Sequence, residues 1–262
     1  MAIAGRLPST WTELSTLLFD LDGTLVDMRP IELELSFFPY LMARFRRHIP
    51  IWRFRAAFWE AARLMQAHRS ERTNYDVFLD ALAAYAPAGR PAVERAAGLA
   101  MTRDFARMRR FFRPVPGARE TLLGAAALGY RLVVATNPVW PLAGVRHRIA
   151  FGGLADVPFE FVASSETMTR TKPDPAYYAE ILTRIGARPD ECLMIGNDPR
   201  KDLPARDVGI RTFLLDRPRA RRPVRDWQTD PRLDGWGSHA GLLEVIRGWS
   251  PGRGPGRAGP TS

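Results

Sequence analysis

Two aspartates separated by one residue follow an apolar run near the start of the chain. Residues 17–27 read LLFDLDGTLVD, and Asp20 and Asp22 come at the end of a predicted strand, ahead of Gly23. Because side chains alternate along a strand, Asp20 and Asp22 would point to one side and Leu21 to the other. Gly23 permits a tight turn directly after them. The spacing predicts two carboxylates that act together on one bound group.

Other polar residues follow further apolar runs or precede a predicted helix. They are Thr136 and Asn137 in VVATN, Asn197, Asp198 and Asp202 in IGNDPRKD, and Lys172 in TKPDP. In an open parallel sheet, ligands bind beyond the carboxyl ends of the strands, where these residues would meet. Converging carboxylates repel one another unless a cation lies among them, and oxygen ligands suit Mg²⁺. A lysine and N–H donors beside such a cation indicate phosphoryl transfer.

The elements that must position these residues are strands alternating with helices. Apolar runs with little alternation predict strands at residues 14–21, 130–136, 191–197 and 211–216, and residues 159–165 predict a further one. Helical stretches that begin at Gly117, Asp174 and Lys201 precede three of them. This order predicts an α/β fold with a Rossmann-like, doubly wound parallel sheet.

A long segment interrupts that rhythm. Residues 28–112 contain no strand pattern, and their apolar residues recur three or four apart, which predicts an inserted domain of about four helices. Helix boundaries are expected at Pro50, near Asn74 and at residues 87–91. The core domain would then comprise residues 1–27 and 113–247. Residues 248–262 are rich in Gly, Pro and Arg and predict a disordered tail.

Composition limits the classes of function. The single cysteine, Cys192, excludes an internal disulfide framework, and no charge-free apolar segment is long enough to span a membrane. The net charge of +10 is carried by 36 arginines and only two lysines, and it lies mainly in residues 28–112 and 217–262. Codon bias explains this skew more simply than binding does. We expect a cytoplasmic protein that binds neither nucleic acid nor membranes.

These motifs resemble those of the haloacid dehalogenase superfamily, in its phosphatase branch. LLFDLDGT, VVATN, TKPDP and IGNDPRKD follow the order of the family's four motifs from residue 17 to residue 202. Each motif alone is weak evidence, but four in order on the expected elements are specific. Residues 28–112 lie where that family carries a helical cap. The resemblance implies a Rossmann-like core and a hydrolase that acts on a small phosphorylated metabolite.

The resemblance also implies catalytic roles. Asp20 would attack phosphorus and form an aspartyl-phosphate, and Asp22 would protonate the leaving oxygen and then deprotonate water. Lys172 would neutralise the charge on the nucleophile and the phosphate. Thr136 and the backbone of Asn137 would bind the phosphoryl oxygens.

For the implied Mg²⁺, the ligands would be the Asp20 carboxylate, the Asp22 backbone carbonyl and an acid of the last motif. The chain departs from the family here, since Asn197 stands directly after the glycine and the acid follows at Asp198. We expect Asp198 to bind the metal, with Asp202 behind it or ordering the loop. Asn197 is the alternative ligand.

Three other interpretations remain open at this point. Dehalogenases of the family lack an acid at the position of Asp22, because halide leaves without a proton, so a phosphatase is favoured. A phosphomutase would use the same residues, and a non-catalytic regulator could keep the fold as a binding module.

The basic segment at residues 43–55 most simply forms a solvated helix face. It could instead hold an anionic substrate or face a partner or membrane.

Overall fold

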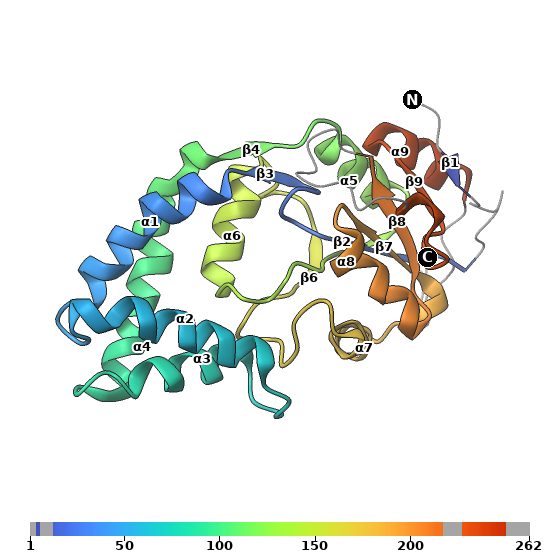
Figure 1. Cartoon of the computed structure of the whole chain (residues 1–262). Coiled ribbons are helices and arrows are strands. Elements are labelled where there is room, and N and C mark those ends of the chain that lie inside the picture. Colours follow the sequence, from blue (N-terminus) through green and yellow to red (C-terminus); the bar gives the residue numbers. More distant parts are fainter. Residues whose placement is uncertain (1–3, 6–12, 217–226, 250–262) are drawn as a thin grey trace, which may run out of the picture.

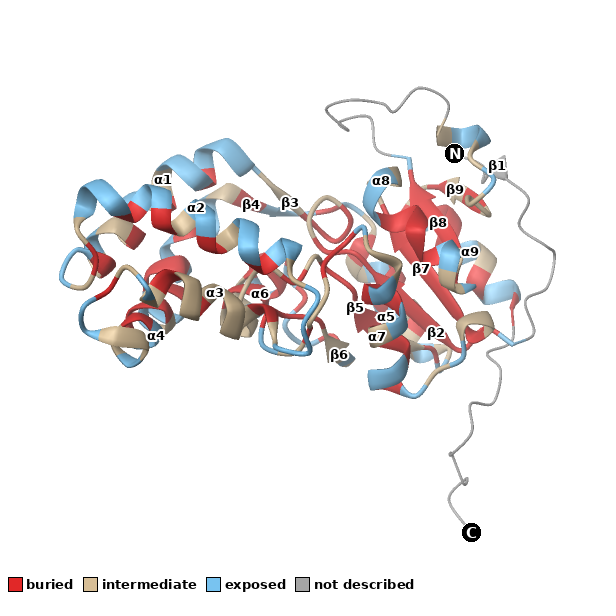
Figure 2. Cartoon of the chain, turned by 60° about the horizontal axis from the view of Figure 1, so that its bottom comes forward, coloured by how far each residue is buried: buried red, intermediate tan, exposed pale blue. Residues whose placement is uncertain are grey.

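The computed structural model describes residues 4–5, 13–216 and 227–249. Figure 1 shows two parts side by side: a sheet with its covering helices, and a group of helices from residues 30–111, called here the helical region. The central strands of the sheet are almost wholly buried, whereas the helices of the helical region alternate between buried and exposed positions (Figure 2).

Within the described residues the sheet has seven strands in the order β1-β9-β8-β7-β2-β5-β6. All neighbours pair in parallel except β1 and β9. Their bounds are β1 Ala4–Gly5, β2 Thr16–Phe19, β5 Arg131–Val134, β6 Phe159–Val162, β7 Cys192–Gly196, β8 Arg211–Leu215 and β9 Gly235–Gly237. The mostly parallel sheet and its flanking helices confirm the predicted α/β fold class.

Alternation along β2 explains why both faces of the sheet are covered. Leu17 and Phe19 belong to one apolar cluster, with α5 (Ala118–Ala127) and α9 (His239–Gly248), whereas Leu18 belongs to another, with α7 (Pro175–Ile185). The Asp174 carboxylate caps α7 by accepting from the Ala176 N–H. A short helix, α8 (Pro199–Asp202), follows β7 and continues into a 3₁₀ segment, Leu203–Val208.

Four α-helices make up most of the helical region. They are α1 Pro30–Phe45, α2 Ile51–Ala67, α3 Asn74–Ala83 and α4 Gly89–Leu99, followed by a π-helical turn, Ala100–Asp104, and a 3₁₀ segment, Phe105–Phe111. Buried residues of α1 recur at helical spacing, at Leu33, Phe37, Leu41 and Phe45. Helices α2, α3 and α4 begin where the prolines and Asn74 predict. The domain boundaries themselves stay a prediction.

Some elements differ from the sequence-based expectation. Helix α6 (Leu142–Phe151) was not predicted, nor were the antiparallel pair β3 (Val26–Met28) and β4 (Phe112–Pro114), where the chain enters and leaves the helical region. Gly248 ends α9 and Trp249 is buried, so the predicted tail does not begin at 248; residues 250–262 lie outside the described part. No helix in the described residues is long and apolar enough to cross a membrane.

Candidate active site

The loop after β2 lies at the centre of the candidate site. Strand β2 pairs with β5 on one side and β7 on the other, so the residues after these three strands meet at one edge. The backbone then turns sharply: Gly23 has φ +91°, and the N–H groups of Leu25 and Val26 both bond to the Leu21 carbonyl. A Cβ on Gly23 would lie 2.2 Å from Asn197 Nδ2. Glycine is therefore needed both for the turn and for the close approach of Asn197.

Lys172 joins two of the predicted acids. Its Nζ donates to Asp20 Oδ1 at 3.0 Å and to Asp202 Oδ1 at 2.6 Å. The lysine side chain is completely buried, and the Asp202 side chain nearly so. The second oxygen of Asp202, Oδ2, accepts the backbone N–H groups of Asn197 and Asp198, both at 3.0 Å. Asp202 therefore fixes the loop after β7 and the ammonium group at once.

Burial and charge alter the proton affinities in this cluster. Burial raises the pKa of Asp20 to about 6, against the opposing effect of Lys172 and with help from Asp202 and Asp22. Burial alone would lower the pKa of Lys172, but the carboxylates of Asp20 and Asp202 outweigh it and raise that pKa above its ordinary value. Lys172 is thus a fixed positive charge beside Asp20.

The two predicted phosphoryl-binding residues lie at the adjacent strand end. Thr136 is buried, and its carbonyl accepts the Tyr177 hydroxyl at 2.6 Å. Asn137 Oδ1 accepts the backbone N–H of Lys172 at 3.1 Å. The structure thus gives the Asn137 side chain a positioning task that the sequence did not predict.

The metal ligands predicted from the sequence are only partly brought together. Asp198 caps α8, with Oδ1 accepting the Arg200 N–H at 3.0 Å and Oδ2 lying 3.8 Å from Lys201 Nζ. Instead, Asn197 and Asp20 share a neighbour: the Thr24 hydroxyl is 3.2 Å from Asn197 Oδ1 and 3.4 Å from Asp20 Oδ2. In the described part of the chain, no three His, Cys, Asp or Glu side chains are grouped so that they could hold a metal ion.

The neighbourhood of Thr24 nevertheless fits a hard cation. Its hydroxyl carries one proton, which can serve only one of the two oxygens that lie near it. Whichever of Asp20 Oδ2 and Asn197 Oδ1 does not accept this proton needs another donor or a cation. A carboxylate and an amide oxygen are both ligands that Mg²⁺ accepts. The donor set therefore fits a divalent ion through Asp20 and Asn197, with one carboxylate fewer than predicted.

Arg148 is a residue that the sequence analysis missed. Its guanidinium pairs with Asp22 Oδ2 and lies 5.3 Å from the ring centroid of Trp140, and its side chain is fully buried. Among the described residues, Arg148 Nε and Nη2 and Asp22 Oδ1 have no hydrogen-bond partner. A signal was present, since Val145, Arg148 and Ile149 form one buried stripe of α6. An arginine on an apolar stripe indicates a buried anionic partner.

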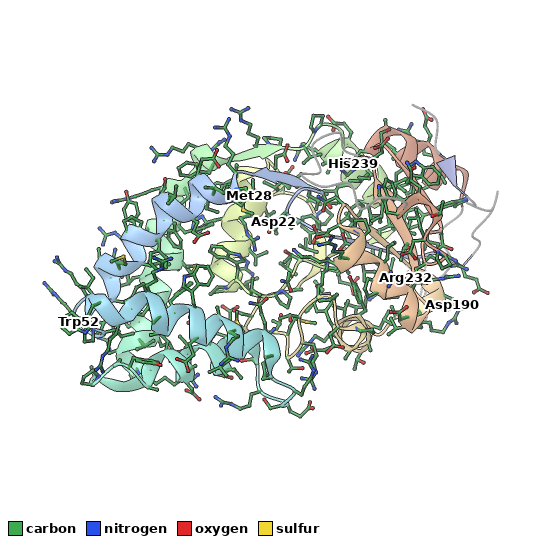
Figure 3. The ribbon with its side chains drawn as sticks, viewed as in Figure 1. Asp22, Met28, Trp52, Asp190, Arg232 and His239 are labelled. Atoms are coloured by element: carbon green, nitrogen blue, oxygen red, sulfur yellow. The ribbon has the colours of Figure 1, made fainter. Side chains whose placement is uncertain are left out.

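A histidine also supports the loop after β2. His239 Nε2 donates to the Thr24 carbonyl at 2.9 Å, and the Thr121 hydroxyl donates to the His239 carbonyl at 3.0 Å. The loop is therefore fastened to both α5 and α9. Figure 3 shows Asp22 at the junction of the sheet and the helical region, with Asp190 and Arg232 at the opposite end of the sheet.

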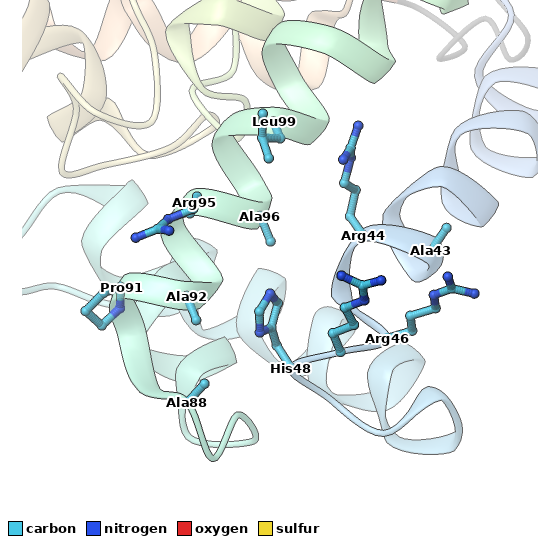
Figure 4. Close-up of a pocket in the computed structure, with 11 residues that line it drawn as sticks. Ala43, Arg44, Arg46, His48, Ala88, Pro91, Ala92, Arg95, Ala96 and Leu99 are labelled. Atoms are coloured by element: carbon cyan, nitrogen blue, oxygen red, sulfur yellow. The ribbon is translucent and has the colours of Figure 1, made fainter.

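The basic segment lies away from this cluster. Arg44, Arg46 and Arg47 line an open hollow of about 640 Å³ with Arg95 of α4, at the end of α1 that is remote from the sheet (Figures 1 and 4). Arg44 is paired with Asp104, at 2.5 Å. These arginines are therefore not placed to hold a phosphoryl group at Asp20.

Comparison with curated proteins identifies phosphatases as relatives. A phosphoglycolate phosphatase of Rhodospirillum rubrum is 35% identical over 109 residues, which cover 42% of this chain and 44% of that protein. A phosphoserine phosphatase of Thermus thermophilus is 34% identical over 150 residues, which cover 53% of this chain and 59% of that protein. The chain thus spans about half the length of these curated relatives.

Solved structures share the fold at lower identity. A haloacid dehalogenase-type phosphatase of Thermococcus onnurineus has a TM-score of 0.55 and 18% identity, with 90% of this chain and 100% of that chain covered. A defluorinating L-2-haloacid dehalogenase has a TM-score of 0.56 and 19% identity, with 92% and 98% covered. The family model of haloacid dehalogenase-like hydrolases matches residues 14–206. That match begins before Asp20 and ends after Asp202, so the chain belongs to the haloacid dehalogenase-like hydrolases.

Proposed function

We propose that this protein is a Mg²⁺-dependent phosphatase that acts on a small phosphorylated metabolite through an aspartyl-phosphate at Asp20. The observation that carries the proposal is the buried ammonium of Lys172 between Asp20 and Asp202. It holds Asp20 Oδ1, and it would offset the negative charge of a phosphoryl group that arrives beside the carboxylate. The phosphatase relatives support the same reaction class.

Asp22 is the proposed proton shuttle. Arg148 holds Oδ2, so the other oxygen, Oδ1, is the one that would give a proton to the leaving alcohol and later take one from water. Its lack of a partner among the described residues supports this assignment, because a buried oxygen without a donor calls for one from the substrate. A phosphate ester needs such a proton, whereas halide expulsion does not.

The remaining residues of the site would bind the phosphoryl group and the metal ion. Thr136 and the Asn137 backbone would bind the phosphoryl oxygens at the end of β5. The Asp20 carboxylate, the Asn197 amide oxygen and the Asp22 backbone carbonyl would hold Mg²⁺, whereas Asp198, the ligand predicted from the sequence, caps α8 instead. When bound, the ion would supply positive charge to the phosphoryl oxygens.

The test is phosphate release from 4-nitrophenyl phosphate with Mg²⁺ present. The wild-type protein should turn over, and Asp20→Asn should lose turnover by at least about 10³-fold, because the amide is a poor nucleophile. Asp190→Asn is the matched control, since Asp190 lies at the far end of the sheet (Figure 3) and should leave the rate unchanged. Full turnover by Asp20→Asn would exclude Asp20 as nucleophile.

A further inference from the structure

The helical region and the loop after β5 line a cavity that is partly open to solvent and whose walls are almost entirely apolar. It measures about 280 Å³ and lies between α1, α2, α3 and the loop after β5. Phe37, Trp59, Phe78 and Trp140 are among its walls. Polar side-chain atoms come from Gln66, Tyr75, Ser165 and the two tryptophan N–H groups, and no charged side chain lines it. A bound group that carries charge would therefore lose its water without gaining a counter-ion.

One wall of the cavity comes from the loop that begins at Thr136 and Asn137 of the candidate active site. Its wall on the sheet side is Val139, Trp140 and Pro141, which follow directly on Asn137 at the end of β5. Trp140 also stacks against Arg148, the partner of Asp22. A neighbouring hollow of about 200 Å³ shares Trp140 and reaches Met28, at the end of β3. Trp140 therefore links the wall of this cavity, through Arg148, to Asp22 of the candidate active site.

The size of the cavity limits what it can hold. A closed cavity of roughly 150 Å³ lined by Leu, Ile and Phe is large enough to bind benzene. The space here accommodates one substituted aromatic ring or a branched aliphatic group of similar bulk. Burial of such a group stabilises a complex by roughly 25 cal/mol per Å² of apolar surface.

Building on the proposed phosphatase activity, we propose that the cavity binds the apolar part of the leaving group, so that the substrate class is phosphomonoesters of alcohols with an aromatic or branched aliphatic group. Transition-state binding then depends on the apolar group as well as on the phosphate. The carboxylates of phosphoglycolate and phosphoserine, which are substrates named for the relatives, would find no counter-charge on these walls.

The experiment compares kcat/KM for 2-phenylethyl phosphate and ethyl phosphate, whose leaving alcohols are alike in acidity. Wild type should favour the phenyl ester by about 10- to 100-fold. Ala62→Trp, which fills the cavity from α2, should bring the ratio near one by lowering kcat/KM for the phenyl ester. Ala56→Trp is the matched control, because Ala56 is exposed on the same helix and outside the cavity wall. Gln66→Glu, at an exposed wall position, should also lower the ratio.

Binding of 2-phenylethanol, measured by tryptophan fluorescence, separates this inference from the proposed function. The alcohol should bind to wild type and to Ala56→Trp, and at least about tenfold more weakly to Ala62→Trp, even in protein that turns over no ester. Absence of phosphate release with binding intact would overturn the phosphatase alone. A wild-type ratio near one, or alcohol binding that survives in Ala62→Trp, would overturn the cavity assignment.

Discussion

The two parts of this molecule differ in how many charged side chains they bury. At the edge of the sheet, buried charges are paired: Lys172 with Asp20 and Asp202, and Arg148 with Asp22. In the helical region the interior is mainly apolar, with packed aromatic rings such as Phe58 against Phe78 at 5.5 Å between centroids, and its buried Asp104 pairs with the more exposed Arg44. The paired charges suit phosphoryl transfer, and the apolar interior suits binding of an apolar group. The difference suggests that reaction type and leaving-group choice are determined by separate segments of the chain.

Lys172→Met should have the largest effect on the sheet edge while leaving the helical region unaffected. This change removes the cation that Asp20 and Asp202 share, so we expect phosphate release to fall by about 10³-fold or more. Binding of 2-phenylethanol should persist, because the cavity is not touched. The measurement is steady-state turnover together with fluorescence titration. Retained turnover in this variant would show that the sheet edge is not the reaction centre.

A second effect concerns the pH dependence of stability in metal-free protein. The pKa of Asp20 is about 6 in the fold, against 3.8 for the unperturbed carboxyl, so the folded chain holds this proton more tightly than the unfolded chain. The contribution of Asp20 to stability is therefore lost as the pH rises from about 4 to about 6. The loss is at most about 3 kcal/mol.

Urea unfolding with a chelator present, at several pH values, measures this effect. Asp20→Asn should lack it, so the stability of wild type relative to the variant should fall across that interval. The comparison with the variant matters, since carboxyls with lowered pKa, such as Asp76 and Asp156, change stability in the opposite direction. A constant difference between the two proteins would contradict the burial of Asp20 as an ionisable group.

Arg148 contacts both Asp22 at the sheet edge and Trp140 of the cavity wall. A substitution there tests whether the cavity affects proton transfer by Asp22. Arg148→Met should leave Asp22 without its partner and slow turnover by about 10- to 100-fold, through kcat more than KM. Removal of one partner from a buried ion pair costs roughly 3–5 kcal/mol, and the partial exposure of Asp22 should reduce that figure. Kinetics with denaturant unfolding measure both. A variant with normal kcat would remove Arg148 from the account of proton transfer.

The smallest effects distinguish Asn197 from Asp198. Asn197→Ala should weaken Mg²⁺ activation by about tenfold, as expected when an oxygen ligand is lost. Asp198→Ala should instead cost about 1 kcal/mol of stability, because it removes the cap of α8, and leave the Mg²⁺ dependence nearly unchanged. Activity against Mg²⁺ concentration measures the first effect and thermal unfolding the second. The reverse pattern would restore Asp198 as the metal ligand.

The sequence predicted the sheet better than the details of the site. Strands β2, β5, β7 and β8 are continuous apolar runs, which identify buried parallel strands without knowledge of their neighbours. Helix α6 was missed because Arg146, His147 and Arg148 interrupt its apolar pattern, and β9 because a strand of Gly, Trp and Gly carries no such pattern.

Within the site, Asp20, Lys172 and Asp202 lie together as the motifs indicated, whereas Asp198 caps α8 and the partner of Asp22, Arg148, was not predicted. Asn197 and Asp198 are adjacent, and only the turn at Gly23 and the first turn of α8 decide that Asn197 lies against Thr24 while Asp198 caps the helix. The ion pair of Asp22 with Arg148 joins residues 126 positions apart. Spacing along the chain carries no information about such a contact.

The central claim is that Asp20 becomes phosphorylated during turnover, and chemical trapping tests it most directly. Borohydride added while the enzyme hydrolyses 2-phenylethyl phosphate with Mg²⁺ should reduce an acyl phosphate to the alcohol. Peptide mass spectrometry should then find homoserine at position 20, and none in Asp20→Asn. Continued turnover with an unmodified Asp20, or homoserine at position 22 instead, would contradict the account.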